Sequence, residues 1–521
     1  MKPPTLAVSS RGMVTSPHAL ASEAGLRALQ SGGNAIEAAV AMGAVLAVTY
    51  PHFCGLGGDA VWLVADRTGR RHCFLGIGQA AEKLPAFDGA IPVRGPASAL
   101  TTACLVDSWR HALDYSRAHW AGTKSFASLL EDAIVLAERG FDITASQRFW
   151  LDFRAGETGD WPGFAPIFGS GSPRLVQRDL AHSLRRLAED GPRDFYEGAL
   201  AVSLAKGLAQ AGSPLSARDL ETTRTRQVKP LALDYGDSTL LAPPPPTQGV
   251  STLAIMGVLR EIGLSDVEEG SADHYHRLVE AVKQAFLDRG AIADPDFVDQ
   301  PVAEWLSPQR LRDKAARIRP DRAMPWPAVF QSADTVFLAA SDAAGNSASL
   351  LQSLYFDWGS GVVAGDTGVL WQNRGAAFDT RRGHPNLLAP GKRPFYTLNP
   401  GIALHGDRPH LLYGTQGADG QPQTLATILS RILDYGLDPL DALSRPRFLL
   451  GRTFSDSRDS LKLEEGVGEG VVDELSARGH EIAAIPRLSP LAGQAGIIAI
   501  DASGTMRGAH DPRSDGLAIG L

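Results

Sequence analysis

The stretch SADTVFLAASDAAGN, residues 332–346, raises the first structural question about this chain. Residues 336–340 form an apolar run that begins with β-forming side chains, so we expect a strand there. A bare Asp334-Thr335 pair stands directly in front of that run. Thr335 is therefore either an ordinary residue at the edge of a strand or a residue whose hydroxyl is used in chemistry.

An Asp-Thr junction in this setting suits the chemistry of an N-terminal nucleophile. The hydroxyl first attacks the preceding carbonyl, and an N-to-O acyl shift followed by hydrolysis cuts the chain. The freed α-amine, with a pKa of about 7.7–8.0, then serves as general base for the same hydroxyl. The preceding link, residues 291–334, is irregular and rich in proline. This link can become strained and move away after cleavage, while the strand holds the new N-terminus in place. On spacing alone, most such threonines are structural.

Length and composition indicate a globular protein larger than one ordinary domain. The chain has 521 residues, of which 44% are hydrophobic and 21% charged, as in proteins with a large core. A formal net charge of −8 argues against nucleic acid as a partner. We find no apolar run long enough for a membrane span and no signal peptide, so the expected location is the cytoplasm. Three cysteines are too few for a disulfide framework or a zinc site.

Hydrophobic periodicity predicts helices in the first part of the chain and strands in the middle. Residues 22–51 read as two helices broken at Gly32-Gly33, and residues 125–144 read as a helix that ends at Gly140. Strand-turn-strand texture follows at 335–378, and helices return near 423–436. This order indicates helical layers that cover a largely antiparallel sheet core.

Three local patterns resemble ligand sites, and each has a simpler explanation. GIGQAA (76–81) has the spelling of a dinucleotide motif, but no clear amphipathic helix follows it. GLGGDA (55–60) could cradle an anion, yet it lacks the Lys and Ser/Thr of a P-loop, so a tight loop is favoured. His274 and His276 lie two residues apart on a predicted helix and do not share a face. We therefore predict neither a metal nor a cofactor.

Seven blocks of sequence resemble the gamma-glutamyltranspeptidase family. They are MVTSPHALASEAGLRALQSGGNAIEAAVA (13–41), PHFCGLGGDA (51–60), GSGVVAGDTGVLWQNRGAAF (359–378), RPFYTLNP (393–400), GTQGADGQPQ (414–423), RPRF (445–448) and DPRSDG (511–516). Precursors of the family are cut before a Thr that lies ten residues upstream of a Gly-Asn turn. Here that turn is Gly345-Asn346, so the resemblance identifies Thr335 as the nucleophile.

The resemblance implies the α+β fold of N-terminal nucleophile hydrolases, a four-layer αββα sandwich. Cleavage between Asp334 and Thr335 would give a large subunit, 1–334, and a small subunit, 335–521. The two would form one intertwined unit, with a homodimer of such pairs as one possible assembly. The small subunit departs from the family in beginning Thr-Val-Phe rather than Thr-Thr-His.

The resemblance also implies roles for individual residues. The hydroxyl that supports the nucleophile falls on Ser353, and the oxyanion hole falls on the backbone N–H groups of Gly417 and Ala418. The pocket for a γ-glutamyl group is largely rewritten. Its carboxylate-binding Arg falls on Gly78, and its amine-binding and serine positions are occupied by Tyr355, Arg374, Ala377, Tyr396 and Thr397.

These departures favour a different substrate. An ammonium group would meet Arg374 and be repelled, whereas a small anionic amide could pair its carboxylate with that guanidinium. Alternatively, Arg374 pairs with a neighbouring acid such as Asp366 or Asp379 and never meets substrate.

The whole pattern is similar to the oxamate amidohydrolase branch of the family, which implies hydrolysis of a short amide acid. Residues 379–393 are also short for the lid of a transpeptidase site, which favours water as acceptor. Two alternatives stay open. One is a gamma-glutamyltransferase, glutathione hydrolase or related acylase, and the other is an uncleaved, inactive relative that acts as a binding protein.

Overall fold

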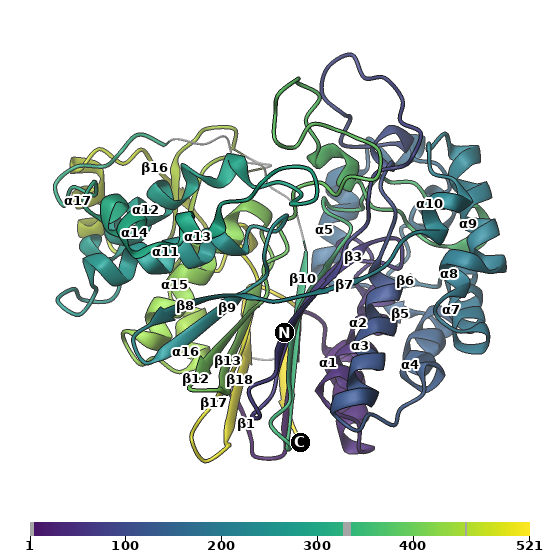
Figure 1. The fold of residues 1–521 in the computed structure, drawn as a ribbon, viewed down its shortest axis with the longest axis horizontal. Coiled ribbons are helices and arrows are strands. Elements are labelled where there is room, and N and C mark those ends of the chain that lie inside the picture. Colours follow the sequence, from purple (N-terminus) through teal and green to yellow (C-terminus); the bar gives the residue numbers. More distant parts are fainter. Residues whose placement is uncertain (1–4, 327–334, 454–455) are drawn as a thin grey trace.

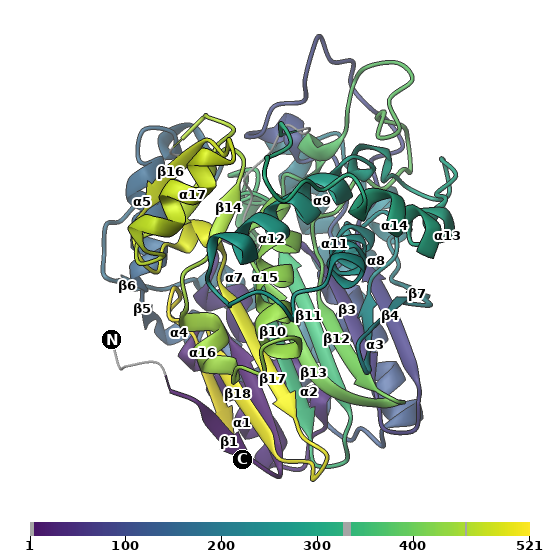
Figure 2. The same cartoon turned by 90° about the vertical axis from the view of Figure 1, so that its left-hand side faces the viewer.

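The computed structural model describes residues 5–326, 335–453 and 456–521. Two seven-stranded sheets stack face to face, and helices cover the outer face of each (Figures 1 and 2). Apolar side chains from both sheets fill the space between them, among them Phe337, Leu351 and Leu412. The prediction of an α+β fold with four αββα layers is confirmed.

The first sheet combines strands from distant parts of the chain. In spatial order it contains β1 (Ala7–Ser9), β18 (Met506–His510), β17 (Ala495–Ile500), β13 (Arg408–Thr415), β12 (Gly401–His405), β9 (Ser238–Ala242) and β8 (Leu231–Tyr235). Every neighbouring pair is antiparallel.

The second sheet is also antiparallel throughout. Its order is β19 (Leu517–Gly520), β2 (Gly12–Ser16), β10 (Val336–Asp342), β11 (Ser347–Ser353), β3 (Asp59–Ala65), β4 (Arg71–Gly76) and β7 (Arg226–Val228). The hairpin of β10 and β11 therefore lies between strands from the first hundred residues. The segments before and after Thr335 cannot fold as separate domains, because they share this sheet.

Helices on the two sides come from different parts of the chain (Figure 1). Against the second sheet lie α1 (Ala19–Gln30), α2 (Ala35–Thr49) and α3 (Leu105–His119), with α4 (Phe126–Arg139) and α7 (Arg178–Asp190) packed outside them. Against the first sheet lie α11 (Gly249–Ile262), α15 (Gln421–Leu433) and α16 (Pro439–Ser444), with α12 (Ala272–Phe286) and α14 (Pro308–Ala315) outside.

The remaining elements complete the two helical layers and add two small sheets. The helices are α5 (Ala145–Arg154), α6 (Ala165–Phe168), α8 (Asp194–Glu197), α9 (Ala199–Ala211), α10 (Ala217–Glu221), α13 (Val302–Trp305) and α17 (Glu469–Ala477). Two small sheets are formed by β5 (Phe141–Asp142) with β6 (Arg174–Leu175), and by β14 (Phe448–Leu450), β15 (Leu461–Glu464) and β16 (Ile482–Ile485).

Local sequence explains the element boundaries that were predicted. The break between α1 and α2 contains Gly32 with φ +85°, and Asn34 then forms a capping box with Glu37. Helix α4 ends at Gly140 with φ +79°, and Gly345, with φ +80°, turns the chain between β10 and β11. The predicted strand after Thr335 is β10, and all of its residues are buried.

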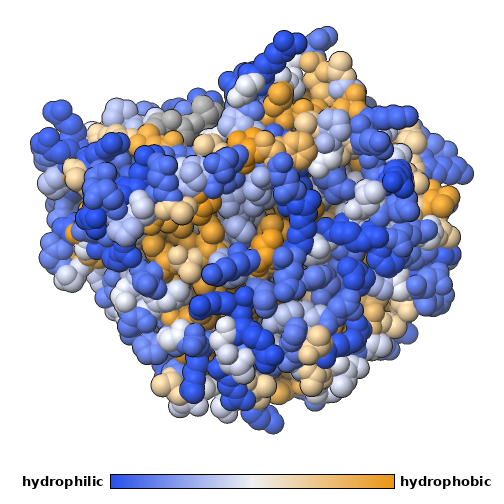
Figure 3. Space-filling model, viewed as in Figure 1, coloured by the Kyte–Doolittle hydropathy of each residue, from blue (hydrophilic) through white to orange (hydrophobic). Residues whose placement is uncertain are grey.

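The structure bears only in part on two further predictions, the boundary between the subunits and the lack of a membrane span. Asp334 lies outside the described residues, so the boundary between subunits stays a prediction. Among the described helices, none is long and apolar enough to cross a membrane. The face in Figure 3 is mostly hydrophilic, with apolar patches between polar side chains.

Candidate active site

One end of the second sheet brings together Thr335, Ser353 and Asp59. Thr335 immediately precedes β10, Ser353 ends β11, and Asp59 begins β3. The register pairs Ser353 with Asp59, and it pairs Val336, the neighbour of Thr335, with Gln352. The predicted nucleophile and its predicted helper therefore stand side by side at the end of adjacent strands.

The same end of the first sheet contributes the opposite wall. Tyr396 and Thr397 come shortly before β12, and Gly417 and Ala418 come shortly after β13. Gln248, from the loop after β9, joins these two segments. Its Nε2 donates to the carbonyl oxygens of Thr397 at 2.8 Å and Ala418 at 2.7 Å. Sequence analysis did not identify Gln248, because only the assembled sheet brings it here.

Thr335 and Ser353 are joined by a hydrogen bond. Thr335 Oγ1 donates to Ser353 Oγ at 3.3 Å, and Ser353 Oγ also accepts the backbone N–H of Tyr355 at 2.8 Å. Both residues are only 1% exposed. A hydroxyl held in this way can be aimed by its neighbour, which fits the predicted supporting role of Ser353.

The predicted oxyanion segment has an unusual backbone. Gly417 has φ +118° and Ala418 has φ +43°, and residues other than glycine rarely adopt such positive φ angles. Tyr355 is also left-handed, with φ +85°, and it packs against Ala418. Among the described residues, neither the N–H of Gly417 nor that of Ala418 donates a hydrogen bond. Strained backbone with unused donors is typical of functional sites.

Arg374 lies fully buried between two tyrosines. Its Cζ is 3.9 Å from the ring centroid of Tyr355 and 4.4 Å from that of Tyr396. Its Nε and Nη2 have no hydrogen-bond partner in the part of the chain that the structure describes. Nη1 makes a long contact of 3.5 Å to Thr397 Oγ1. Burial lowers the pKa of this guanidinium, although the tyrosines and Asp59 oppose the effect.

The proposed neighbours of Arg374 are engaged elsewhere. Asp379 pairs with Arg381 at 2.6 Å, and Asp366 is exposed whereas Arg374 is not. Over the described residues, no carboxylate forms an ion pair with Arg374. Neither Asp366 nor Asp379 pairs with Arg374, and within the described chain two of its nitrogens, Nε and Nη2, have no partner.

Asp59 is a site residue that sequence analysis did not single out. Its Oδ2 accepts the hydroxyl of Tyr396 at 2.7 Å, and its Oδ1 accepts the N–H groups of Gly78 at 3.0 Å and Cys104 at 2.9 Å. Burial raises the pKa of this carboxyl to about 6, against the hydrogen bonds that favour its charged form. The signal for it was present in GLGGDA, where an acidic residue starts a buried strand.

Gly78 shows why an arginine is missing from this position. A Cβ atom added there would lie 1.7 Å from the carbonyl oxygen of Thr102, which is backbone and cannot turn away. No side chain fits without moving the chain. Ala377, where the family has an acid, lies on the same short 3-10 turn as Arg374. The backbone therefore excludes a side chain at Gly78, and the loss of the γ-glutamyl pocket stays a prediction.

A cavity of about 840 Å³ opens beside the site. Ala376 and Phe356, the neighbours of Ala377 and Tyr355, belong to its lining, together with apolar and charged side chains that include Ile91, Phe378 and Arg154. Since Thr335 and Arg374 are buried, this cavity is a candidate entrance or a space for the larger part of a substrate.

The local patterns proved to be structural. Cβ atoms added to Gly57 and Gly58 would lie 2.3 and 2.4 Å from backbone oxygens of Leu370 and Ser353. GLGGDA is thus a tight loop, as favoured, which lets strands approach closely. The strand before GIGQAA ends at Gly76, and the next α-helix begins only at Leu105, so the dinucleotide motif is not formed.

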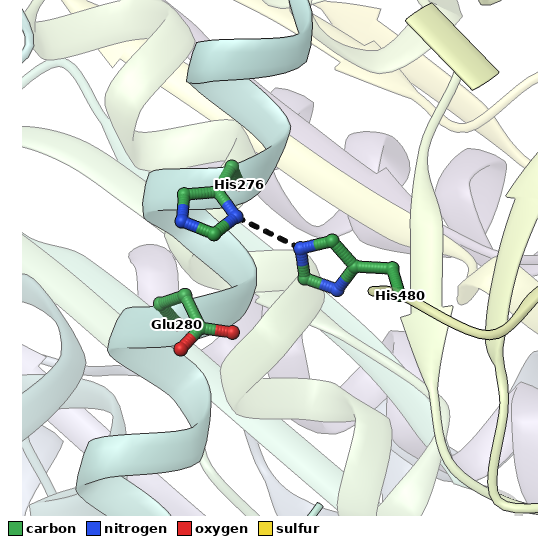
Figure 4. A group of neighbouring side chains, drawn as sticks. All are labelled: His276, Glu280 and His480. Carbon is green, nitrogen blue, oxygen red and sulfur yellow. Dashed lines mark hydrogen bonds between the residues drawn. The ribbon is translucent and has the colours of Figure 1, made fainter. Parts of the chain in front are cut away.

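His276, Glu280 and His480 lie close enough together to hold a metal ion, although the sequence did not indicate them as a group (Figure 4). His276 and His480 are joined by a hydrogen bond of 2.8 Å, and the Nε2 of His276 contacts the carbonyl of Arg319 at 2.7 Å. Glu280 accepts the ammonium of Lys283 at 2.7 Å. His276 is thus engaged by His480 and Arg319, and Glu280 by the cation of Lys283, so a polar cluster explains the three residues without a metal.

Comparison with known proteins gives the same assignment along nearly the whole chain. Residues 21–521 match the family model described as Gamma-glutamyltranspeptidase. An oxamate amidohydrolase proenzyme of Klebsiella pneumoniae subsp. pneumoniae is 42% identical, covering 98% of this chain and 99% of that protein. A glutathione hydrolase-like proenzyme of Bacillus subtilis is 39% identical, covering 99% of each.

A solved structure agrees with the fold in detail. The crystal structure of cephalosporin acylase from Bacillus halodurans superposes with a TM-score of 0.91 at 28% identity, covering 100% of this chain and 98% of that chain.

Proposed function

The chain belongs to the gamma-glutamyltranspeptidase family and is an N-terminal nucleophile hydrolase, and from that premise we propose that it cuts itself before Thr335 and hydrolyses a small anionic amide such as oxamate. The observation that carries the substrate class is the buried guanidinium of Arg374, which has two nitrogens without a partner in the described chain. Proenzymes among its relatives support the self-cleavage.

The proposed reaction uses the pair at the end of β10 and β11. In the cleaved enzyme the α-amine of Thr335 takes the proton of its own hydroxyl, and Oγ1 attacks the amide carbon. The N–H groups of Gly417 and Ala418 stabilise the oxyanion, while Ser353 keeps the nucleophile aligned. The amide nitrogen leaves as ammonia with that proton. Water then attacks the ester, and a carboxylate product forms as Thr335 regains its hydrogen.

Substrate binding would rest on Arg374 and its two tyrosines. The free Nε and Nη2 can hold both oxygens of a carboxylate, and the rings of Tyr355 and Tyr396 keep the guanidinium plane fixed. Thr397 Oγ1, near Nη1, is a further polar group for the substrate. A γ-glutamyl substrate would lack its usual arginine, because Gly78 cannot carry a side chain.

A comparison of substrates tests this proposal. The cleaved wild-type protein should give a higher kcat/KM for oxamate than for a γ-glutamyl anilide. A tenfold preference for the anilide would overturn the substrate assignment. A denaturing gel with N-terminal sequencing tests cleavage separately, and the expected new terminus is Thr335.

An acylase that takes a larger amide is the second candidate. The cavity of about 840 Å³ beside the site favours it, since oxamate alone would leave that space unused. Glutaryl and longer acyl amides, assayed beside oxamate, distinguish the two.

A further inference from the structure

Asp59 is a buried charge to which the proposed reaction gives no role. It is 0% exposed and stands opposite Ser353 at the start of β3. Its two oxygens accept three hydrogen bonds, one from the hydroxyl of Tyr396 and two from backbone N–H groups. Burial raises the pKa of the carboxyl to about 6 against these donors, which still leaves it mostly ionised at neutral pH, so this group is a negative charge placed at the site.

Tyr396 lies between this negative charge and Arg374. The ring of Tyr396 stacks on the guanidinium at 4.4 Å, while its hydroxyl reaches Asp59 at 2.7 Å. Arg374 has no direct ion pair in the described chain, and a buried cation without a counter-charge is costly. Asp59 and Asp419 both act on the charge of Arg374, but Asp419 already pairs with Arg289. The geometry therefore leaves Asp59, one aromatic ring away, as the counter-charge.

We propose that Asp59 is the counter-ion of Arg374 and that Tyr396 holds it at a distance. Its negative charge lowers the affinity of Arg374 for anions enough for a dicarboxylate product to dissociate. This inference rests on the proposed function. Hydrolysis of an anionic amide turns a substrate with one negative charge into a product with two. A site whose only charge was a buried guanidinium would hold that product more tightly than the substrate and would stall.

The position of Asp59 serves this balance. A carboxylate in direct contact with Arg374 would occupy the nitrogens that the substrate needs. At one ring's distance it lowers the local positive potential and leaves Nε and Nη2 accessible. Charges a few ångströms further apart still interact strongly in a buried site, where the effective dielectric constant is about 20. Asp59 is thus a positioning residue for Tyr396 and a specificity-determining charge for anions.

The test uses oxalate as the probe and the cleaved enzyme. Asp59→Asn keeps the shape of the side chain and an oxygen for the backbone N–H groups, but it removes the charge. We expect oxalate, measured by calorimetry, to bind about tenfold more tightly than to the wild type. The kcat for oxamate should fall while KM does not rise. A merely structural role would give the opposite, because a disturbed pocket binds oxalate more weakly.

Controls separate the possible failures. Asp107→Asn removes an equally buried carboxylate on α3 that pairs with Arg110 and Arg193, and oxalate affinity should not change. If Arg374→Gln abolishes oxalate binding but Asp59→Asn leaves it unchanged or weaker, this inference is wrong and the proposed function stands. If the wild type does not bind oxalate at all, both are wrong. Asp59→Ser provides the same comparison if Asp59→Asn does not fold.

Discussion

Arg374 and Arg513 are both buried arginines, yet the protein surrounds their charges in opposite ways. Arg513 donates to Glu464 Oε1 at 2.7 Å, to Asp511 Oδ1 at 3.1 Å and to the carbonyl of Leu443 at 2.6 Å. Arg374 has two aromatic faces and two nitrogens without partners over the described residues. Burial opposes both charges, but Asp511 and Glu464 raise the pKa of Arg513, whereas that of Arg374 is lowered.

The difference separates a charge that holds the fold from a charge that waits for a ligand. Arg513 sits in an ion-pair cluster of Arg447, Glu464, Asp511 and Arg513, which joins β15 to the segment after β18. Arg374 sits at the end of the sheets, beside strained backbone at Tyr355 and Ala418. Changes in the cluster should therefore affect unfolding, and changes in the site should affect chemistry.

The largest effect is expected from Thr335→Ala. The variant should remain one full-length chain and lose at least about 10³-fold in activity, because both cleavage and turnover need the hydroxyl. Its unfolding midpoint should stay close to that of wild-type precursor isolated before cleavage is complete. Intact mass and amidase assays measure the first two. Cleavage in this variant, or activity near that of the wild type, would remove Thr335 from the site.

Arg513→Gln should show the opposite behaviour. Breaking a buried ion pair on one side leaves Glu464 and Asp511 uncompensated, which costs about 3–5 kcal/mol of unfolding free energy. Protein that does fold should retain a normal KM for oxamate. Urea denaturation measures the first effect, and a loss below 1 kcal/mol would mean that the cluster is not structural.

Arg374→Gln completes the exchange between the two arginines. It should lower kcat/KM for an anionic amide by an amount that corresponds to a loss of about 2–5 kcal/mol of transition-state binding. The free energy of unfolding should stay unchanged or increase. Cleavage should still occur, because it does not involve the substrate. A large loss of stability with unchanged kinetics would place Arg374 in the same class as Arg513.

Part of the fold could be predicted from the sequence, because the signals for it are local. The apolar run after Thr335 is contiguous, so it predicted the strand that is β10. The assignment of Thr335 as nucleophile came from the resemblance to the family and stays a prediction. Likewise, Gly32 and Gly140 marked helix ends through backbone conformations that few other residues adopt. The positions of Ser353 and Arg374 came from family resemblance rather than from physical pattern.

Contacts between distant segments could not be predicted in this way. The bond from Tyr396 to Asp59 joins residues 337 positions apart, and that from His276 to His480 joins residues 204 apart. Neither leaves a periodic signal, because each depends on how the two sheets stack. The sequence shows a glycine at position 78, but the carbonyl of Thr102, which excludes a side chain there, is visible only in the fold.

Ser353→Ala should give a smaller effect within the site. We expect cleavage and turnover to slow by about one to three orders of magnitude, the usual loss of one hydrogen bond to a group that gains charge. Ser353→Thr, which keeps the hydroxyl, is the matched control and should recover most of the rate. Equal rates in wild type and Ser353→Ala would make Ser353 an ordinary strand residue.

The smallest expected effect is on the pH dependence of the unfolding free energy, to which carboxylates of the two regions should contribute with opposite signs. Burial raises the pKa of Asp59 to about 6, more than the bonds from Tyr396 and Cys104 lower it, whereas an unfolded Asp titrates near about 3.9. The folded state thus binds a proton more tightly, so the contribution of Asp59 to stability is complete below about pH 4 and is lost as pH rises through about 6. For Asp511, the charges of Arg447 and Arg513 outweigh burial and lower the pKa, so its contribution is present at neutral pH and is lost only in acid.

The sign for Asp59 can be measured. As pH falls from 7 to 4.5, the unfolding free energy of the wild type relative to Asp59→Asn should increase by about 1–3 kcal/mol. Urea denaturation across that range measures the difference, and a value that does not change with pH would show that Asp59 titrates alike in both states and carries no special charge at the site.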